Sequence, residues 1–248
     1  MKNLLASEPP AHRTMSSELG SGGAGPLVVP VVPPGCAEAI VDDDGSVESG
    51  YGWVPSSTEG IFLQEYQGEE VPSGFLESVC VCWLRTRMDD TIDFEIVLYE
   101  HNGSHESPPK EPFAAVPAQL AGVPLGVPGA TFAEVPLGGV PVPDGPFYLG
   151  VRWDPSVDDF FFICVDKTSA PEPPTRVFFR DNTFPAGWAV SDQTSDPTFD
   201  DHQALLVRPV PAPAPEIQPI ADVPLGDAAR FALVIALLAT GALMVRRL

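Results

Sequence analysis

The sequence predicts an all-β protein, a β-sandwich of jelly-roll-like type, and three observations support this prediction. Thirty prolines in 248 residues disfavour a helix-rich fold, because proline removes a helical hydrogen bond and clashes with the preceding turn. Short runs rich in valine, isoleucine and aromatic residues recur along residues 36–208, separated by turns that contain Gly or Pro. No alternation of strands with helices is visible, which disfavours a parallel sheet.

Residues 1–35 show no core pattern, and we predict a disordered, Gly/Pro-rich segment there. Residues 1–6 resemble the opening of a signal peptide, but Glu8, Pro9 and Pro10 stand where its apolar region should follow. Because the cysteines point to export, we expect the export signal to lie upstream of the printed start; the alternative is that the chain enters the membrane by its tail alone.

The predicted sandwich occupies residues 36–208. Its clearest strands are 76–84 and 91–99, and in the second Ile92 and Phe94 would face the core while Asp93 and Glu95 face water. The other strands are predicted at residues 61–66, 147–153, 159–165, 175–179 and 203–208. Residues 113–146 alternate apolar pieces with Gly and Pro, so we expect edge strands and long connections there.

Four cysteines, Cys36, Cys80, Cys82 and Cys164, form an even set that predicts two disulfides outside the cytoplasm. Cys80 and Cys82 are two apart in a predicted strand, so they project from the same face and do not easily bond to each other. Cys36 and Cys164 are then the expected partners, and the pairing stays open. The alternatives are buried free thiols or a metal site, although no Cys-x-x-Cys pair or nearby histidine completes a zinc set.

Enzyme signatures are absent from the sequence, and we predict that the protein is not an enzyme. It contains no Gly-x-Ser-x-Gly elbow, phosphate loop, His-Glu-x-x-His or Gly-x-Gly-x-x-Gly motif. A hydrolase with paired carboxylates remains the alternative, since Asp and Glu are plentiful.

The sequence predicts no cofactor, with a structural calcium ion as the alternative, and it assigns no metal ligands. His101 and His105 share one loop with two glutamates, which could bind a transition metal or form an ordinary hairpin tip. Acidic clusters near strand ends could jointly supply the six to eight oxygens of a structural calcium ion, or simply form turns. These clusters are Asp42, Asp43, Asp44 and Glu48; Asp89 and Asp90; Asp154, Asp158 and Asp159; and Asp196, Asp200 and Asp201.

Aromatic residues offer a second kind of site. Trp83 and Trp153 lie within predicted strands and are expected in the core. Tyr51, Trp53 and Trp188 lie in Gly/Pro-rich segments, where exposed rings could stack on sugars.

Charge excludes one class of partner. Thirteen basic and 34 acidic residues give a net charge of −21, which repels phosphate backbones, so we predict no nucleic-acid partner. The same charge suits a solvated extracellular domain or the binding of cations.

The C-terminal part predicts a stalk and a membrane segment. Alternating prolines favour an extended, Pro-rich stalk over residues 209–222. Residues 231–245 carry no charge and span roughly 22 Å as a helix; with the preceding residues they predict a transmembrane helix at 228–245. Arg246 and Arg247 form a basic anchor that suits the cytoplasmic side. The alternative is a helix buried against the sandwich, which an all-round apolar surface disfavours.

The order of these parts, a short Pro-containing motif, an apolar helix and a basic end, resembles the PEP-CTERM group of bacterial sorting tails. The motif Val223, Pro224, Leu225 and Gly226 is similar to that of the IPTL-CTERM branch, although the threonine is missing. The resemblance covers residues 223–248. It implies recognition by an exosortase-type membrane transpeptidase, cleavage near Pro224, and delivery to the envelope or exterior of a Gram-negative bacterium.

We therefore expect an exported bacterial surface or secreted protein with a non-catalytic β-sandwich domain. Its expected location is the cell envelope, where the helix anchors it or processing releases it. The alternative is a carbohydrate- or calcium-binding extracellular module. The sequence alone names no ligand.

Overall fold

The computed structural model describes residues 12–16, 29–47, 49–53, 57–85, 91–103, 108–123, 130–157, 161–166, 177–181, 187–190 and 204–213. The predicted membrane helix at 228–245, and the stalk beyond residue 213, lie outside this part. None of the helices within it is both long and apolar enough to span a bilayer.

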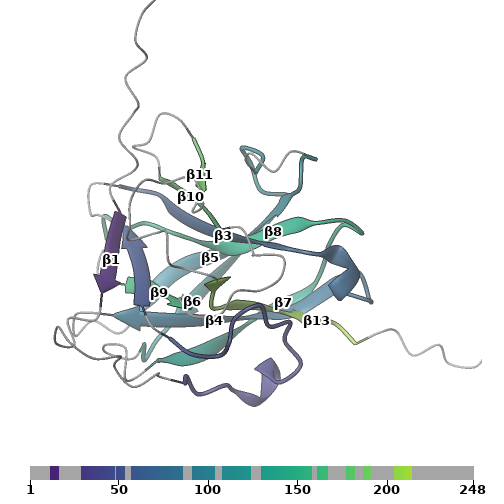
Figure 1. Cartoon of the computed structure of the whole chain (residues 1–248), viewed down its shortest axis with the longest axis horizontal. Coiled ribbons are helices and arrows are strands. Elements are labelled where there is room, and N and C mark those ends of the chain that lie inside the picture. Colours follow the sequence, from purple (N-terminus) through teal and green to yellow (C-terminus); the bar gives the residue numbers. More distant parts are fainter. Residues whose placement is uncertain are drawn as a thin grey trace, which may run out of the picture. The chain divides into compact units, whose positions relative to one another are not determined.

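Two sheets of antiparallel strands build the described domain (Figure 1). The first contains, in spatial order, β11 (Ala189–Val190), β10 (Val177–Asp181), β3 (Gly60–Tyr66), β8 (Phe147–Trp153), β5 (Ile92–Glu100) and β6 (Ala114–Leu120). We call it the six-stranded sheet.

The second sheet has seven strands and is centred on β4 (Phe75–Arg85). β4 and its neighbour β7 (Thr131–Pro141) are the longest of the described strands. The path of this sheet runs through β1 (His12–Ser16), β2 (Ser49–Trp53), β9 (Phe161–Asp166), β4 and β13 (Val207–Pro211), with β7 also paired to β4 and β12 (Ala204–Leu205) paired to β9. Two short 3-10 helices, η1 (Pro34–Cys36) and η2 (Gly68–Glu70), lie in connections.

The facing sides of the two sheets enclose one apolar core, so the all-β sandwich predicted from the sequence is confirmed. Val81 and Trp83 of β4 pack in the same cluster as Phe62 of β3 and Val151 of β8. In β5, Ile92, Phe94, Ile96 and Leu98 all belong to this cluster, whereas Asp93 and Glu95 do not. This is the alternation expected of a strand with one buried face. The jelly-roll character stays a prediction.

A third layer covers the outer face of the seven-stranded sheet. Residues 29–47, which we call the N-terminal strap, run across it; η1 of the strap is visible at the bottom of Figure 1. Cys36 and Val47 of the strap pack with Phe132 and Phe162 in a second buried cluster. The strap is also bonded through its main chain, since Phe132 N donates to the Val31 carbonyl at 3.1 Å. This sheet is therefore apolar on both faces.

β1, β2 and β13 lie where the sequence predicted other structure. β1 falls within residues 1–35, which showed no core pattern, and it pairs with β2. Pro209 and Pro211, assigned to the stalk, belong to β13, which is paired with β4 among the described strands. Proline is tolerated in a strand that pairs with a neighbour on one side only. On the unpaired side, its missing N–H costs no hydrogen bond between strands.

Gly60 is required by the packing of the core. A Cβ at this position would overlap the indole atoms Cδ1 and Nε1 of Trp53. Trp53 is fully buried and stacks on Phe62 with ring centroids 4.9 Å apart, so it has little room to move. We expect Gly60→Ala to lower the free energy of unfolding by about 1–3 kcal/mol, measured by urea denaturation.

The matched control is Gly145→Ala, because a Cβ at Gly145 would meet no atom within 4 Å. It is expected to change stability by no more than about 0.5 kcal/mol. Equal losses in the two variants would show that overlap with Trp53 is not the cause.

Candidate functional site

A depression of about 640 Å³ opens on the six-stranded sheet, near the start of β3 and the end of β8. Its polar lining residues come from several strands and their ends: Thr58, Glu59, Asp93, Glu95, Gln119, Arg152 and Asp154. Pro117 and Ala118 of the edge strand β6 add an apolar part. The lining therefore combines hydrogen-bond donors, acceptors and a small apolar surface.

Strand register brings these side chains together. Glu95 of β5 is opposite Arg152 of β8 on one side and Pro117 of β6 on the other. Asp93, two residues earlier on the same face of β5, is opposite Gln119. Opposed residues of antiparallel strands have adjacent side chains, so β5 places Glu95 beside Arg152 of β8 and Asp93 beside Gln119 of β6.

Ion pairs fix Arg152 in place. Its Nε donates to Glu95 Oε2 at 2.6 Å, and its Nη1 lies 3.9 Å from Glu59 Oε2. Glu59 is also paired with Arg180, whose Nη2 lies 3.2 Å from Glu59 Oε1. Burial acts to lower the pKa of Arg152, but the hydrogen bond and charge of Glu95 outweigh it and raise that pKa. Arg152 thus stays positively charged.

The remaining polar groups of the depression are held by local bonds. Gln119 Nε2 donates to Asp93 Oδ1 at 2.7 Å. Asp154 Oδ1 accepts hydrogen bonds from the main-chain N and the hydroxyl of Ser156, at 2.9 and 2.6 Å. Each group keeps further lone pairs or protons for a ligand. The side chains of Arg152, Glu59 and Glu95 are 22%, 32% and 36% exposed, so solutes can reach them.

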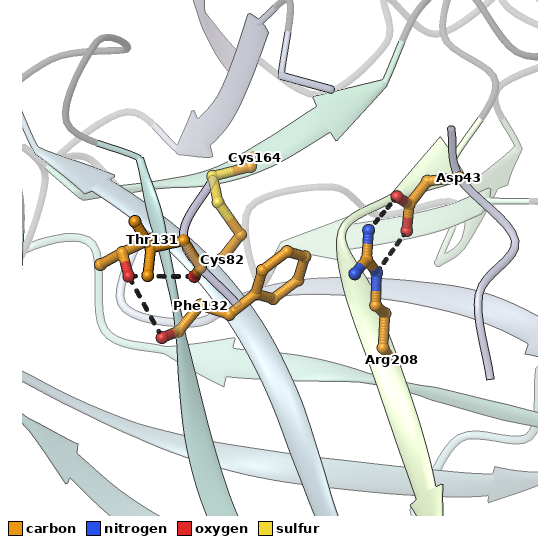
Figure 2. Close-up of a disulfide and its surroundings, with 7 residues drawn as sticks. Asp43, Cys82, Thr131, Phe132, Cys164 and Arg208 are labelled. Atoms are coloured by element: carbon orange, nitrogen blue, oxygen red, sulfur yellow. Dashed lines mark hydrogen bonds and ion pairs between the residues drawn. A yellow bond between two sulfur atoms is a disulfide. The ribbon is translucent and has the colours of Figure 1, made fainter. Parts of the chain in front are cut away.

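The two disulfides lie on the opposite sheet and under the strap. Cys36 bonds to Cys80, and Cys82 bonds to Cys164, with Cα–Cα distances of 5.9 and 5.3 Å. Figure 2 shows the second bond beside Phe132. The prediction of two disulfides is confirmed, as is the exclusion of a bond between Cys80 and Cys82. All four residues are at most 3% exposed.

A buried ion pair lies next to these disulfides (Figure 2). Arg208 of β13 donates from Nε to Asp43 Oδ2 at 2.9 Å and from Nη2 to Asp43 Oδ1. The guanidinium also lies over the ring of Phe132, 4.2 Å from its centroid. The side chains of Arg208 and Asp43 are 6% and 1% exposed. Together they attach the strap to the sheet.

A second polar group joins the strap to the sheet interior. Gln64 of β3 donates from Nε2 to Tyr66 Oη at 2.9 Å and to Asp42 Oδ2 at 3.3 Å, and its Oε1 accepts from Leu205 N at 2.7 Å. Burial, with a smaller contribution from Glu70, raises the pKa of Asp42 to about 6. Burial likewise raises the pKa of Tyr66 well above its usual value.

The raised pKa of Asp42 makes stability depend on pH. The folded state binds this proton more tightly than the unfolded chain, in which the pKa of Asp42 is 3.8. The stabilising contribution is therefore complete below about pH 4 and is lost as pH rises through about 6. We expect Asp42→Asn, which is neutral and keeps an acceptor for Gln64, to stabilise the protein at pH 7.5 by about 1 kcal/mol, a figure discounted for partial exposure.

Urea denaturation of both proteins from about pH 4 to about pH 8 tests this, and the gain should vanish at the acidic end. Asp144→Asn, at an exposed aspartate, is the control. A gain that does not change with pH would contradict the assignment to Asp42.

The aromatic residues considered for sugar stacking do not line the depression, except for Trp153. Tyr51 and Trp53, expected to be exposed, are fully buried in the core, which corrects that expectation. Trp188 is half-buried and donates from Nε1 to the Pro109 carbonyl at 3.2 Å. Trp83 and Trp153 are in the core, as predicted.

The candidate metal ligands that the structure describes do not come together as a metal centre. Among the described residues, no group of three or more His, Cys, Asp or Glu is placed to hold an ion. His101 Nδ1 accepts from Gly103 N at 3.1 Å. The remaining site residues lie outside the described ranges: Glu48, His105, Asp89, Asp90, Asp158, Asp159, Asp196, Asp200, Asp201, Val223, Pro224, Leu225, Gly226, Arg246 and Arg247. Calcium binding and the sorting tail therefore stay predictions.

Similarity to known proteins is weak. No family model and no curated protein matches the chain. Among solved structures, the chain is similar to the crystal structure of the cysteine protease and lectin-like domains of Cwp84, a surface layer associated protein of Clostridium difficile, with a TM-score of 0.42 and 11% identity. The likeness covers 70% of this chain and 35% of that one. It does not establish a shared family or activity.

Proposed function

We propose that this chain is an exported protein of the bacterial cell envelope or exterior, whose β-sandwich acts as a non-catalytic module outside the cytoplasm. The observation that carries the proposal is the pair of buried disulfides, Cys36–Cys80 and Cys82–Cys164. Such bonds form and persist in oxidising compartments and are rare in the bacterial cytoplasm.

The non-catalytic role is supported by how the depression uses its carboxylates. Glu59 and Glu95 are ion-paired with Arg152, and Asp93 accepts a hydrogen bond from Gln119. Carboxylates held in such ion pairs and hydrogen bonds are suited to positioning and recognising a ligand.

The proposed route to the surface depends on the tail. The motif Val223, Pro224, Leu225 and Gly226, the helix at 228–245 and the basic anchor of Arg246 and Arg247 resemble a sorting signal. We propose that the helix inserts in the membrane and that an exosortase-type transpeptidase processes the chain near Pro224. The acidic stalk and domain would then remain outside.

Fractionation of a Gram-negative host that carries such a transpeptidase, and that expresses the gene together with its upstream region, tests the proposal. We expect the protein in the envelope or medium, with both disulfides formed and a C-terminus near Pro224, as determined by mass spectrometry of the unreduced protein. The matched variant Arg246→Ala/Arg247→Ala should keep the disulfides but alter processing. Recovery of the intact, reduced chain from the cytosol would refute export.

A further inference from the structure

We propose that the depression on the six-stranded sheet binds a neutral, hydroxyl-rich ligand, namely an oligosaccharide. The inference gives a ligand class to the module proposed above, and it rests on that proposal only for the location where the ligand is met. It concerns Glu59, Asp93, Glu95, Gln119 and Arg152, which line the depression.

The first argument is the mixture of donors and acceptors. Arg152 and the amide of Gln119 donate hydrogen bonds, whereas the carboxylates of Glu59, Asp93 and Glu95 accept them. A sugar hydroxyl both donates and accepts, so one kind of ligand group can bond to every member of this set. A ligand group that only donates or only accepts would leave part of the set without a partner.

The second argument is charge. Four carboxylates line the depression, including Asp154, and the whole chain has a net charge of −21, so an anionic ligand is repelled. A cation would have to compete with the guanidinium of Arg152, which is already paired with Glu59 and Glu95. A neutral ligand is not repelled and leaves these ion pairs intact.

The third argument is preorganisation. The polar side chains stand on paired strands, and ion pairs or hydrogen bonds already fix their positions: Arg152 by Glu95, and Gln119 by Asp93. A ligand therefore need not order long, mobile side chains, which otherwise weakens binding. The volume of about 640 Å³ lies within the usual range for small-molecule sites. Pro117, on the same face as Glu95, offers apolar contact for a sugar ring face.

Isothermal titration of the oxidised, full-length chain tests the inference. The probes are neutral oligomers of glucose, mannose, galactose and N-acetylglucosamine, with oligolysine and polygalacturonate as cationic and anionic comparisons. We expect at least one neutral oligomer to bind with a Kd of about 1 mM or tighter, and neither charged probe to displace it.

Variants locate the binding. Arg152→Met and Gln119→Leu should each weaken it about tenfold, the loss expected when one or two hydrogen bonds to a ligand are removed. Gln119 is exposed on an edge strand, so Gln119→Leu should fold even if Arg152→Met does not. Lys110→Met and Glu100→Gln change exposed charges that do not line the depression and should bind as the parent does.

Two results would overturn the inference: no binding of any neutral oligomer, or binding that Arg152→Met and Gln119→Leu leave unchanged. Binding of oligolysine with no sugar binding would identify a cation site instead, and would also overturn it. These titrations use purified protein. A failure of export in cells would therefore leave their outcome unaffected, and the two proposals fail separately.

Discussion

Replacing Cys82 and Cys164 together by alanine is expected to lower the free energy of unfolding by about 4 kcal/mol. The bond joins residues 82 positions apart, and a cross-link that closes a loop of this size restricts the unfolded chain by roughly that amount. In a domain of this size the loss corresponds to a decrease in Tm of about 10 °C. Calorimetry of the oxidised proteins at equal pH measures it.

Removal of the other bond, by Cys36→Ala/Cys80→Ala, serves as the comparison. It closes a loop of 44 residues, so its loss should be smaller by about 0.5 kcal/mol. It should also speed hydrogen exchange in the strap, residues 29–47, more than elsewhere. A Tm that either double variant leaves unchanged would show that the bond does not form in the protein.

Asp43→Asn is expected to lower the free energy of unfolding by about 3–5 kcal/mol. The substitution leaves the guanidinium of Arg208, only 6% exposed, without its counter-charge inside the protein. The double variant Asp43→Asn/Arg208→Met removes both charges and should lose less than Asp43→Asn alone. Urea denaturation of the three proteins gives the comparison.

The control is Glu95→Gln, which removes one partner of the half-exposed pair with Arg152. Because water screens that pair, the expected loss is below about 1 kcal/mol. Similar losses for Asp43→Asn and Glu95→Gln would contradict the difference in burial on which this prediction depends.

The strands of the sandwich were predictable where residue type and periodicity agree. β5 is the clearest example, since Ile92, Phe94 and Ile96 alternate with polar residues and all three enter the core. β2 was missed because Gly50 and Gly52 were read as a loop. In the structure a Cβ at Gly52 would lie 2.8 Å from Phe162 Cδ1, so glycine here permits close packing of neighbouring strands.

The long-range pairings could not be predicted from the sequence. The spacing of Cys80 and Cys82 excluded a bond between them, but only the path of the strap decides which of them meets Cys36. Asp43 and Arg208 are 165 positions apart, and nothing local links them. The depression likewise depends on register, which places Glu95 between Arg152 and Pro117 on strands remote in sequence.

The strap has a practical consequence for anyone who wishes to trim this protein. A fragment that begins at β2 would retain every predicted strand of the sandwich, yet it would present Phe132, Phe162 and Leu84 to solvent and would leave Cys80 as a free thiol. A wide apolar surface beside a reactive sulfur favours self-association and cross-linked dimers. Shortened versions that keep this surface covered should therefore begin no later than Val29.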